Sequence, residues 1–354
     1  MSASPFDHPL LSHLLGDPEI AALFAPEAEL KEMLAFEAAL AEAEAAEGVI
    51  PQAAATAIAA VLKSFKPDLA GLAAGVAKDG LPVPALVKQI KAKLGESDAK
   101  HFHFGTTSQD LIDTGLALRL RAVAHVLDER LVGLIERLDG VAGQHGKREL
   151  MGRTRMQRAR PITVAEKVAH WREPLARHRE RLVELAPRLF LLQFGGAVGN
   201  RHELGAPGHN HGEAVAERLA KALRLHNPVA ARHSERDGVV EFAGWLSLIA
   251  GSLGKLGADV ALMAQHEVGE VKVAGGGGSS AMPEKQNPIS AEILVTLARF
   301  NAALLSGMHD ALVHENERSG AAWTLEMMLL PQMCVATGAA LNHATRLTEA
   351  VSFP

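Results

Sequence analysis

The chain has little of several residue types, and each shortage narrows its class. One cysteine, Cys334, occurs in 354 residues, so no disulfide can form within the chain and nothing points to an oxidising compartment. Tyrosine is absent and aromatic residues make up only 4% of the chain, whereas alanine and leucine are abundant. Because strands favour β-branched and aromatic residues, this composition predicts an all-α fold.

A strong charge excess and long apolar runs are also missing. The formal net charge of −5 argues against nucleic acid as a partner. No uninterrupted apolar run reaches the ~18–20 residues that a membrane span needs. The first seven residues lack the basic and apolar blocks of a signal peptide. We therefore expect a cytoplasmic protein without a membrane or nucleic-acid partner.

Signatures of metal and dinucleotide binding are scarce. The sequence has no cysteine pair, no His-Glu-x-x-His motif and no Gly-x-Gly-x-x-Gly motif after a strand. It also lacks the Gly-x-Ser-x-Gly elbow of many serine hydrolases. His209-Asn210-His211 could bind a metal, but we interpret this segment as a surface loop.

Helical periodicity dominates what is present. Apolar residues at helical spacing predict a small N-terminal helical domain over residues 1–100 and a bundle of about five long helices over residues 101–354, with no strand. The predicted helices cover 27–46, 52–64, 67–78, 85–94, 111–149, 163–192 with breaks near Pro174 and Pro187, 239–273, 289–313 and 323–350.

Residues 275–288 are the most informative stretch. Four consecutive glycines cannot form a stable helix and allow the chain to move. Lys285 and Asn287 follow, and we predict Asn287 as the N-cap and Pro288 as the first residue of the next helix, whose free N–H groups attract anions. A flexible linker would explain the glycines but not the residues after them. We interpret the stretch as a mobile anion-binding lid.

Three further polar stretches lie at predicted helix ends: 101–110, 152–163 and 314–323. The second carries four arginines, which suit carboxylates or form a solvated basic surface. In the first, the hydroxyl groups of residues 106–108 could bind a ligand or only cap a helix, for which Ser108 and Asp110 are available.

Taken in order, these stretches resemble the site regions of the fumarase/aspartase superfamily. Residues 278–288 match the motif Gly-Ser-Ser-x-Met-Pro-x-Lys-x-Asn-Pro at every fixed position. Within the superfamily, 193–199 and 314–323 look most like bacterial 3-carboxy-cis,cis-muconate lactonizing enzymes. Arg155 stands where most members have histidine, which favours substrate binding by Arg155. Members usually continue into a third, C-terminal helical domain, which we expect to be absent here.

The resemblance implies a homotetramer whose active sites are each shared by three subunits. It implies a small polycarboxylate substrate, no metal and no organic cofactor, and a cycloisomerisation in which one substrate carboxylate adds to a diene through an aci-carboxylate intermediate. The implied catalytic residues are Ser279, Lys285 and Asn287, and His103 is a candidate for proton transfer. The implied substrate-binding residues are Thr107, Ser108, Gln109, Thr154, Arg155, Gln157, Ser280, Met282 and Arg318.

Three alternatives stay open at this stage. A lyase of the adenylosuccinate or argininosuccinate type would use the same chemistry and release fumarate. A cycloisomerase could act on a sulfonated muconate instead. An inactive helical scaffold would need neither Ser279 nor Lys285, so their presence argues against it.

Overall fold

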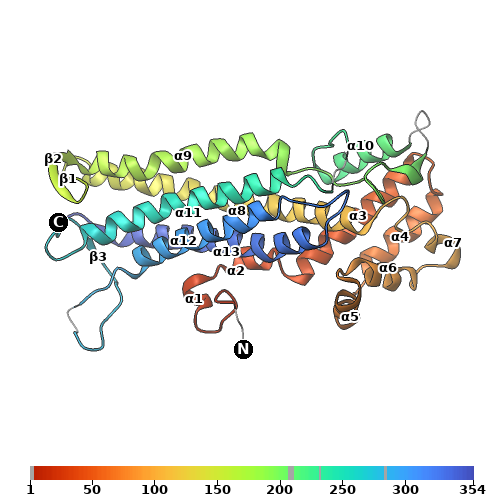
Figure 1. Ribbon diagram of the computed structural model, residues 1–354, viewed down its shortest axis with the longest axis horizontal. Helices are drawn as coiled ribbons and strands as arrows, with labels where there is room; N and C mark the ends of the chain where they lie inside the picture. Colours follow the sequence, from red (N-terminus) through yellow and green to blue (C-terminus); the bar gives the residue numbers. More distant parts are fainter. Residues whose placement is uncertain (1–3, 206–210, 231–232, 283–284) are drawn as a thin grey trace.

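The computed structural model describes residues 4–205, 211–230, 233–282 and 285–354. The molecule is elongated, with the helices of residues 52–99 at one end, the N-terminus beside the middle and the C-terminus at the other end (Figure 1). The N-terminal elements are α1 (Ser12–Leu15), α2 (Pro18–Ala22), α3 (Pro26–Ala46), α4 (Gln52–Ser64), α5 (Leu69–Asp79), α6 (Val83–Lys91) and α7 (Glu96–Ala99). The remaining elements are α8 (Ser108–His145), β1 (Glu149–Thr154), β2 (Gln157–Thr163), α9 (Val164–Leu189), η1 (His202–Leu204), α10 (His211–Leu223), α11 (Asp237–Met263), β3 (Lys272–Val273), α12 (Ile289–Asp310), α13 (Ala321–Ala350) and β4 (Val351–Ser352).

The five long helices α8, α9, α11, α12 and α13 lie along one another and form the bundle, which confirms the all-α prediction. Their shared core is aliphatic, and Leu134, Leu253 and Leu341 are fully buried in it. Burial of this kind contributes about 25 cal/mol for each Å² of apolar surface removed from water. It therefore supplies most of the stability of these helices.

Two glycines on α11 allow it to approach α12 closely. A Cβ atom at Gly254 would lie 2.5 Å from the Cβ of Ala298, and one at Gly257 would lie 2.5 Å from the carbonyl oxygen of Ala291. Real Cβ atoms do not come this close to other heavy atoms. The glycines thus set the distance between α11 and α12, and the lid directly precedes α12.

The prediction that α9 breaks at its prolines is wrong. The helix runs from Val164 to Leu189 with Pro174 and Pro187 inside it. Each proline removes one backbone hydrogen bond and crowds the preceding turn. Burial of the neighbouring Trp171 and Leu175 in the bundle core offsets that cost.

A second core joins the N-terminal helices to the beginning of α8 and to α10. Its members include Phe36, Ile58 and Ile90 from the N-terminal helices and Leu111 and Leu219 from beyond residue 100. The prediction placed no helix at α10. The division of the chain at residue 100 stays a prediction, since this core draws on both sides of that boundary.

Residues 149–163 form an antiparallel hairpin, so the prediction of a polar loop without strands is wrong here. Glu149 pairs with Thr163 and Thr154 pairs with Gln157, with an irregularity between Met151 and Arg153. A second, shorter pair joins β3 to β4. Arginine and threonine tolerate extended backbone, and two short strands need no aromatic-rich sequence to pair at a bundle end.

By length and composition alone, α11, α12 and α13 could cross a membrane, although no uninterrupted apolar run suggested it. In the structure all three belong to the bundle, and α12 packs against both α11 and α13. Only 22% of the most apolar window of α12 is buried within the chain. The apolar residues of this helix that are not fully buried, such as Ile293, Phe300 and Leu304, are therefore only partly covered by the described residues.

Candidate active site

The N-terminus of α8 is built on a reciprocal cap. Thr107 and Asp110 form a capping box, in which the Asp110 carboxylate accepts from the backbone N–H of Thr107 at 3.0 Å. Ser108, proposed as a cap from the sequence, is instead the first helical residue. The cap satisfies helix N–H groups that would otherwise be unpaired and fixes the chain direction just before Gln109.

Asp110 is fully buried and accepts hydrogen bonds from both flanks of the site. Its Oδ1 accepts from Gly195 N at 2.9 Å and lies 2.6 Å from Nε2 of His233, while its Oδ2 accepts from Gly196 N at 2.9 Å and from Thr106 Oγ1 at 3.0 Å. A buried carboxylate needs several donors of this kind to offset its desolvation. Asp110 therefore ties the loop before η1 to the beginning of α8.

Gln109 and Arg318 meet at the same place, although 209 positions separate them. Arg318 Nε donates to Gln109 Oε1 at 3.0 Å, and its Nη2 donates to the Ala197 carbonyl at 3.1 Å. Gln109 Nε2 donates in turn to Asp113 at 3.0 Å and to the His233 carbonyl at 3.1 Å. The Gln109 amide is thus oriented on both sides, and the Arg318 guanidinium stays exposed, as a carboxylate ligand requires.

Below this pair lies a buried ionic cluster that the sequence reasoning missed. Arg236 contacts Asp113 at 2.7 Å and Glu326 at 2.9 Å, and Trp323 Nε1 donates to Asp113 at 3.1 Å. Burial alone would lower the pKa of Arg236, but the two carboxylates outweigh it and raise the pKa above its ordinary value. The cluster holds α8, α11 and α13 in register beneath the site. In the sequence, this cluster is indicated only by charged residues within otherwise apolar helical stretches.

His314, in the loop between α12 and α13, has both ring nitrogens buried without a hydrogen-bond partner among the described residues. Burial, followed by the nearby charge of Arg236, lowers its pKa. His314 is therefore a neutral imidazole at neutral pH, next to the segment that carries Arg318.

The arginine-rich hairpin lies at the opposite end of the bundle. Arg153 donates to Glu270 at 2.7 Å, and Met151 N donates to the same carboxylate at 3.2 Å. Arg155 and Met156 form the tip with left-handed φ angles of 48° and 66°. The predicted ligand-binding residues of this region are all exposed: Thr154, Arg155 and Gln157.

The lid lies at that same end, between β3 and α12 (Figure 1). Its base is closed by Gly277 and Asn287, which exchange backbone hydrogen bonds of 2.9 and 2.8 Å. A Cβ at Gly277 would lie 2.6 Å from the side chain of Ile289, so a larger residue there would require that side chain to move. The predicted cap is wrong by one residue, because α12 begins at Ile289 and its N-cap, Pro288, offers no side-chain hydrogen bond.

Ser279 is held within the lid by a local turn. Its Oγ accepts from Met282 N at 3.1 Å and from Ala281 N at 3.3 Å. Ser280, Met282 and Lys285 are exposed. Pro283 and Glu284 of the motif lie outside the described residues. The Ser279 hydroxyl has its lone pairs engaged by backbone donors, which leaves its proton free to point away from the lid.

Within one chain, the predicted residues therefore fall into two groups. Thr107, Gln109 and Arg318 lie where α8 begins, and the hairpin follows directly after α8 ends. The 38 residues of α8 span roughly 57 Å at about 1.5 Å per residue. The lid lies beside β4, one length of α13 away from Arg318. No single chain can bring both groups to one small substrate.

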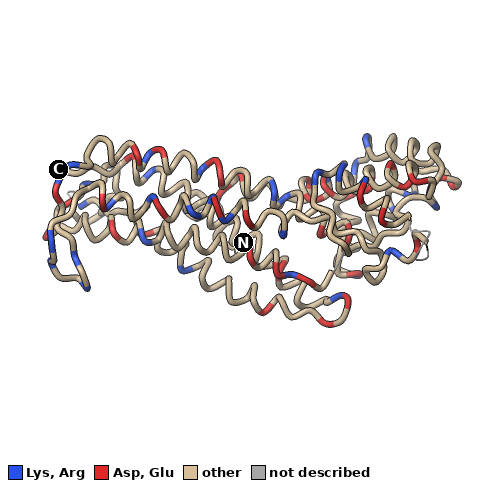
Figure 2. Tube along the Cα trace, turned by 90° about the horizontal axis from the view of Figure 1, so that it is seen from above, with Lys and Arg blue, Asp and Glu red and all other residues tan. Residues whose placement is uncertain are grey.

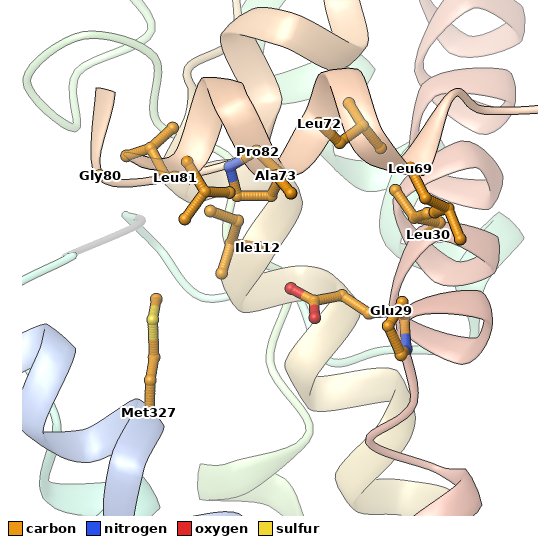
Figure 3. Close-up of a pocket in the computed structure, with 12 residues that line it drawn as sticks. Glu29, Leu30, Leu69, Leu72, Ala73, Gly80, Leu81, Pro82, Ile112 and Met327 are labelled. Atoms are coloured by element: carbon orange, nitrogen blue, oxygen red, sulfur yellow. The ribbon is translucent and has the colours of Figure 1, made fainter. Parts of the chain in front are cut away.

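An apolar cavity of about 360 Å³ lies between α3, α5, α8 and α13 (Figure 3). Leu30, Leu72, Leu81 and Ile112 line it, with the Glu29 carboxylate at one side. It contains none of the predicted site residues. An apolar wall with one carboxylate would repel a polycarboxylate, so we do not assign the substrate to it.

Charged residues of both signs are interspersed along the molecule (Figure 2). Among residues 4–205, 211–230, 233–282 and 285–354, no group of three or more His, Cys, Asp and Glu side chains is arranged to hold a metal. His209 and Asn210 of the possible metal motif lie outside these ranges.

Fold and site together define a member of a lyase family. Residues 17–304 match the family described as Lyase, and the chain belongs to it. Two lines of comparison then agree on a narrower group. A 3-carboxy-cis,cis-muconate cycloisomerase of Pseudomonas aeruginosa is 42% identical over 334 residues, which are 93% of this chain and 72% of that protein.

Solved structures point the same way. The crystal structure of 3-carboxy-cis,cis-muconate lactonizing enzyme from Pseudomonas putida matches with a TM-score of 0.90 and 39% identity, over 98% of this chain and 78% of that chain. The corresponding cycloisomerase from Acinetobacter calcoaceticus matches with a TM-score of 0.90 and 32% identity over the same shares. The resemblance inferred from the motifs is confirmed.

Proposed function

We propose that this chain is a cofactor-independent cycloisomerase that converts 3-carboxy-cis,cis-muconate to 4-carboxymuconolactone in aromatic catabolism. The observation that carries the proposal is the Arg318–Gln109 pair, which presents an oriented, exposed guanidinium at 3.0 Å from an amide fixed by buried partners. A guanidinium fork held in this way suits a carboxylate. The similarity to cycloisomerases of 3-carboxy-cis,cis-muconate supports the choice of substrate.

The reaction joins one substrate carboxylate to the diene. A carbon–oxygen bond forms, the electron pair of the double bond moves into the neighbouring carboxylate, and the resulting aci-carboxylate collapses as a proton is added to carbon. Ser279 supplies that proton as general acid, and Lys285, Asn287 and the lid N–H groups stabilise the doubled charge. The site needs to be closed and dry for a serine hydroxyl to act in this way.

The remaining site residues bind substrate carboxylates. Arg155, at the tip of the hairpin, replaces a histidine and takes a binding role. His103 is the candidate for the second proton-transfer group. The proposed substrate-binding set is Thr107, Ser108, Gln109, Thr154, Arg155, Gln157, Ser280, Met282 and Arg318.

The active enzyme is proposed to be a cytoplasmic homotetramer with each site shared by three subunits. Two observations support this. The predicted site residues lie at opposite ends of a helix of roughly 57 Å, as calculated from its 38 residues. Only 22% of the most apolar window of α12 is buried among the described residues, and packing against other subunits would bury more of it.

The decisive experiment mixes purified protein with 3-carboxy-cis,cis-muconate and follows loss of the muconate absorbance, with and without EDTA. We expect turnover that EDTA does not change. Ser279→Ala should lower kcat about 10²–10⁴-fold with the fold retained. Ser280→Ala, its neighbour, should act mainly on KM. Near-normal turnover of Ser279→Ala would remove that residue from the mechanism.

Two parallel assays separate the alternatives. Release of fumarate from adenylosuccinate or argininosuccinate, with no reaction of the muconate, would overturn the cycloisomerase assignment. A higher kcat/KM for a sulfonated muconate than for the carboxylated one would reassign the substrate and keep the reaction.

A further inference from the structure

His103 has a backbone conformation that its neighbours must enforce. It lies in the loop between α7 and α8, four residues before Thr107, with a φ angle of 62°. Left-handed backbone is uncommon for residues other than glycine and persists only where surrounding contacts over-determine it. In this conformation a hydrogen bond of 2.5 Å joins His103 Nδ1 to Glu37 Oε1.

Glu37 comes from the middle of α3 and is buried, with only 1% of its surface exposed. A carboxyl at such a position is costly unless it is hydrogen-bonded, and a leucine would fill the same volume without that cost. The hydrogen bond to His103 supplies such a partner. Packing alone therefore gives no reason for a carboxyl at position 37.

A second buried carboxyl on α3, that of Glu44, provides a comparison with Glu37. Glu44, two turns further on, is also 1% exposed, and its Oε1 has no hydrogen-bond partner among the described residues. Burial, followed by the nearby Glu37, raises the pKa of Glu44 to about 9. Glu44 therefore stays uncharged at neutral pH, and only Glu37 is engaged by a ring nitrogen.

Binding of Nδ1 by Glu37 decides which atom of His103 can act. A neutral imidazole has one donor and one acceptor nitrogen, and the partner of one nitrogen sets the role of the other. With Nδ1 donating to Glu37, Nε2 is the ring nitrogen left for a substrate. The side chain is 16% exposed, so part of the ring is open to solvent.

We propose that Glu37 is a positioning residue, which fixes the ring of His103 so that Nε2 exchanges a hydrogen bond or proton with the bound polycarboxylate. The inference rests on the proposed function, because it assigns a task to His103 in that same site. It adds a residue that the polar motifs did not contain and that lies 66 positions away from its partner.

A double-mutant cycle tests this role. Glu37→Gln, His103→Asn and the double variant are compared for kcat and KM with 3-carboxy-cis,cis-muconate. We expect Glu37→Gln to lower kcat about 10-fold or more, as misplacement of a reacting group does. In the His103→Asn background the same change should have no further effect. Equal losses in both backgrounds, or wild-type kcat for Glu37→Gln, would overturn the inference.

Glu44→Gln is the matched control, since it changes a carboxyl to an amide on the same helix at the same burial. It should keep wild-type kcat, and thermal unfolding of all variants shows whether the fold is retained. If Glu44→Gln lowers kcat as much as Glu37→Gln, burial and not positioning explains the result, and the inference fails.

A measurement without substrate separates this inference from the proposed function. Diethylpyrocarbonate acylates unprotonated ring nitrogens, and peptide mass spectrometry reads the rate at His103 alone. We expect Glu37→Gln to change this rate and Glu44→Gln to leave it as in the wild type. An inactive wild type with a changed rate would reject the substrate and keep the positioning role, whereas an unchanged rate would reject that role.

Discussion

Oδ1 of Asp110 lies 2.6 Å from Nε2 of His233, and both side chains are buried. The other ring nitrogen of His233 lies 3.5 Å from Nη2 of Arg318. A guanidinium can only donate, so Nδ1 accepts and Nε2 carries the proton that goes to Asp110. His233, in a single tautomer, thus links the Asp110 carboxylate to the exposed Arg318.

Asp110→Asn should disrupt this arrangement. The amide of this variant would place an NH₂ group opposite groups that are themselves donors. We expect this to lower the free energy of unfolding by about 3 kcal/mol. We also expect KM to rise, because His233 would no longer hold Arg318 in place. Urea unfolding and steady-state kinetics measure both. Asp79→Asn, at an exposed position, serves as the control and should change neither. Unaltered stability in Asp110→Asn would contradict this account of the site.

Arg236→Met should be among the most damaging single changes in the chain. It leaves Asp113 and Glu326 buried without their shared cation, which typically costs about 3–5 kcal/mol. Arg188→Met is the comparison, because Arg188 pairs with Glu241 at the exposed surface and should matter much less. Similar unfolding midpoints for the two variants would show that the buried cluster does not stabilise the bundle.

The proposed sharing of the site between subunits predicts complementation. Ser279→Ala and Arg318→Met should each be inactive, but hybrid tetramers formed by refolding the two together should regain part of the turnover, since some sites combine an intact lid with an intact Arg318. Mixing Ser279→Ala with Lys285→Met, both on the lid, should restore nothing. Recovery in neither mixture would argue that each chain works alone.

His178 should make the bundle sensitive to acid. It lies between α9 and α11, with Nε2 at 2.8 Å from Ser252 Oγ. Burial, followed by the charges of Arg181 and Arg177, lowers its pKa to about 4. Since the unfolded chain binds a proton near pH 6.5 and the folded chain does not, stability falls as the pH drops from 6.5 towards 4.

His178→Gln should remove that contribution while keeping a polar partner for Ser252. The difference in unfolding free energy between wild type and variant should therefore change between pH 7 and pH 4.5, by no more than about 1.4 kcal/mol per pH unit, which is the limit for one proton. Denaturant titrations at the two pH values measure it. A constant difference would show that His178 does not titrate in this window.

The features predicted correctly from the sequence are those that depend on residues close together in the chain. The long helices follow from apolar residues at helical spacing, because that pattern is local and repeats over many turns. The lid motif of residues 275–288 indicated the family without any contact information, and the comparisons confirm it. The capping box at Thr107 and Asp110 has a three-residue spacing that a closer inspection of the sequence could have found.

Other features depended on distant partners. Pro174 predicted a break in α9, but burial of Trp171 and Leu175 maintains the helix. The hairpin at 149–163 has no strong strand composition, and its strands form where α8 and α9 bring them together. His233 and Arg236 gave no signal, because their importance comes from Asp110 and Asp113, more than 120 positions earlier.

The sequence by itself determined the long helices and the family, since each depends on patterns within short stretches of the chain. Only the tertiary structure decided that Asp110, His233 and Arg318 share one end of the bundle while Ser279 and Arg155 lie at the other. The physical reason is that burial and ionic pairing between distant residues select one arrangement of helices. The helical pattern alone allows many.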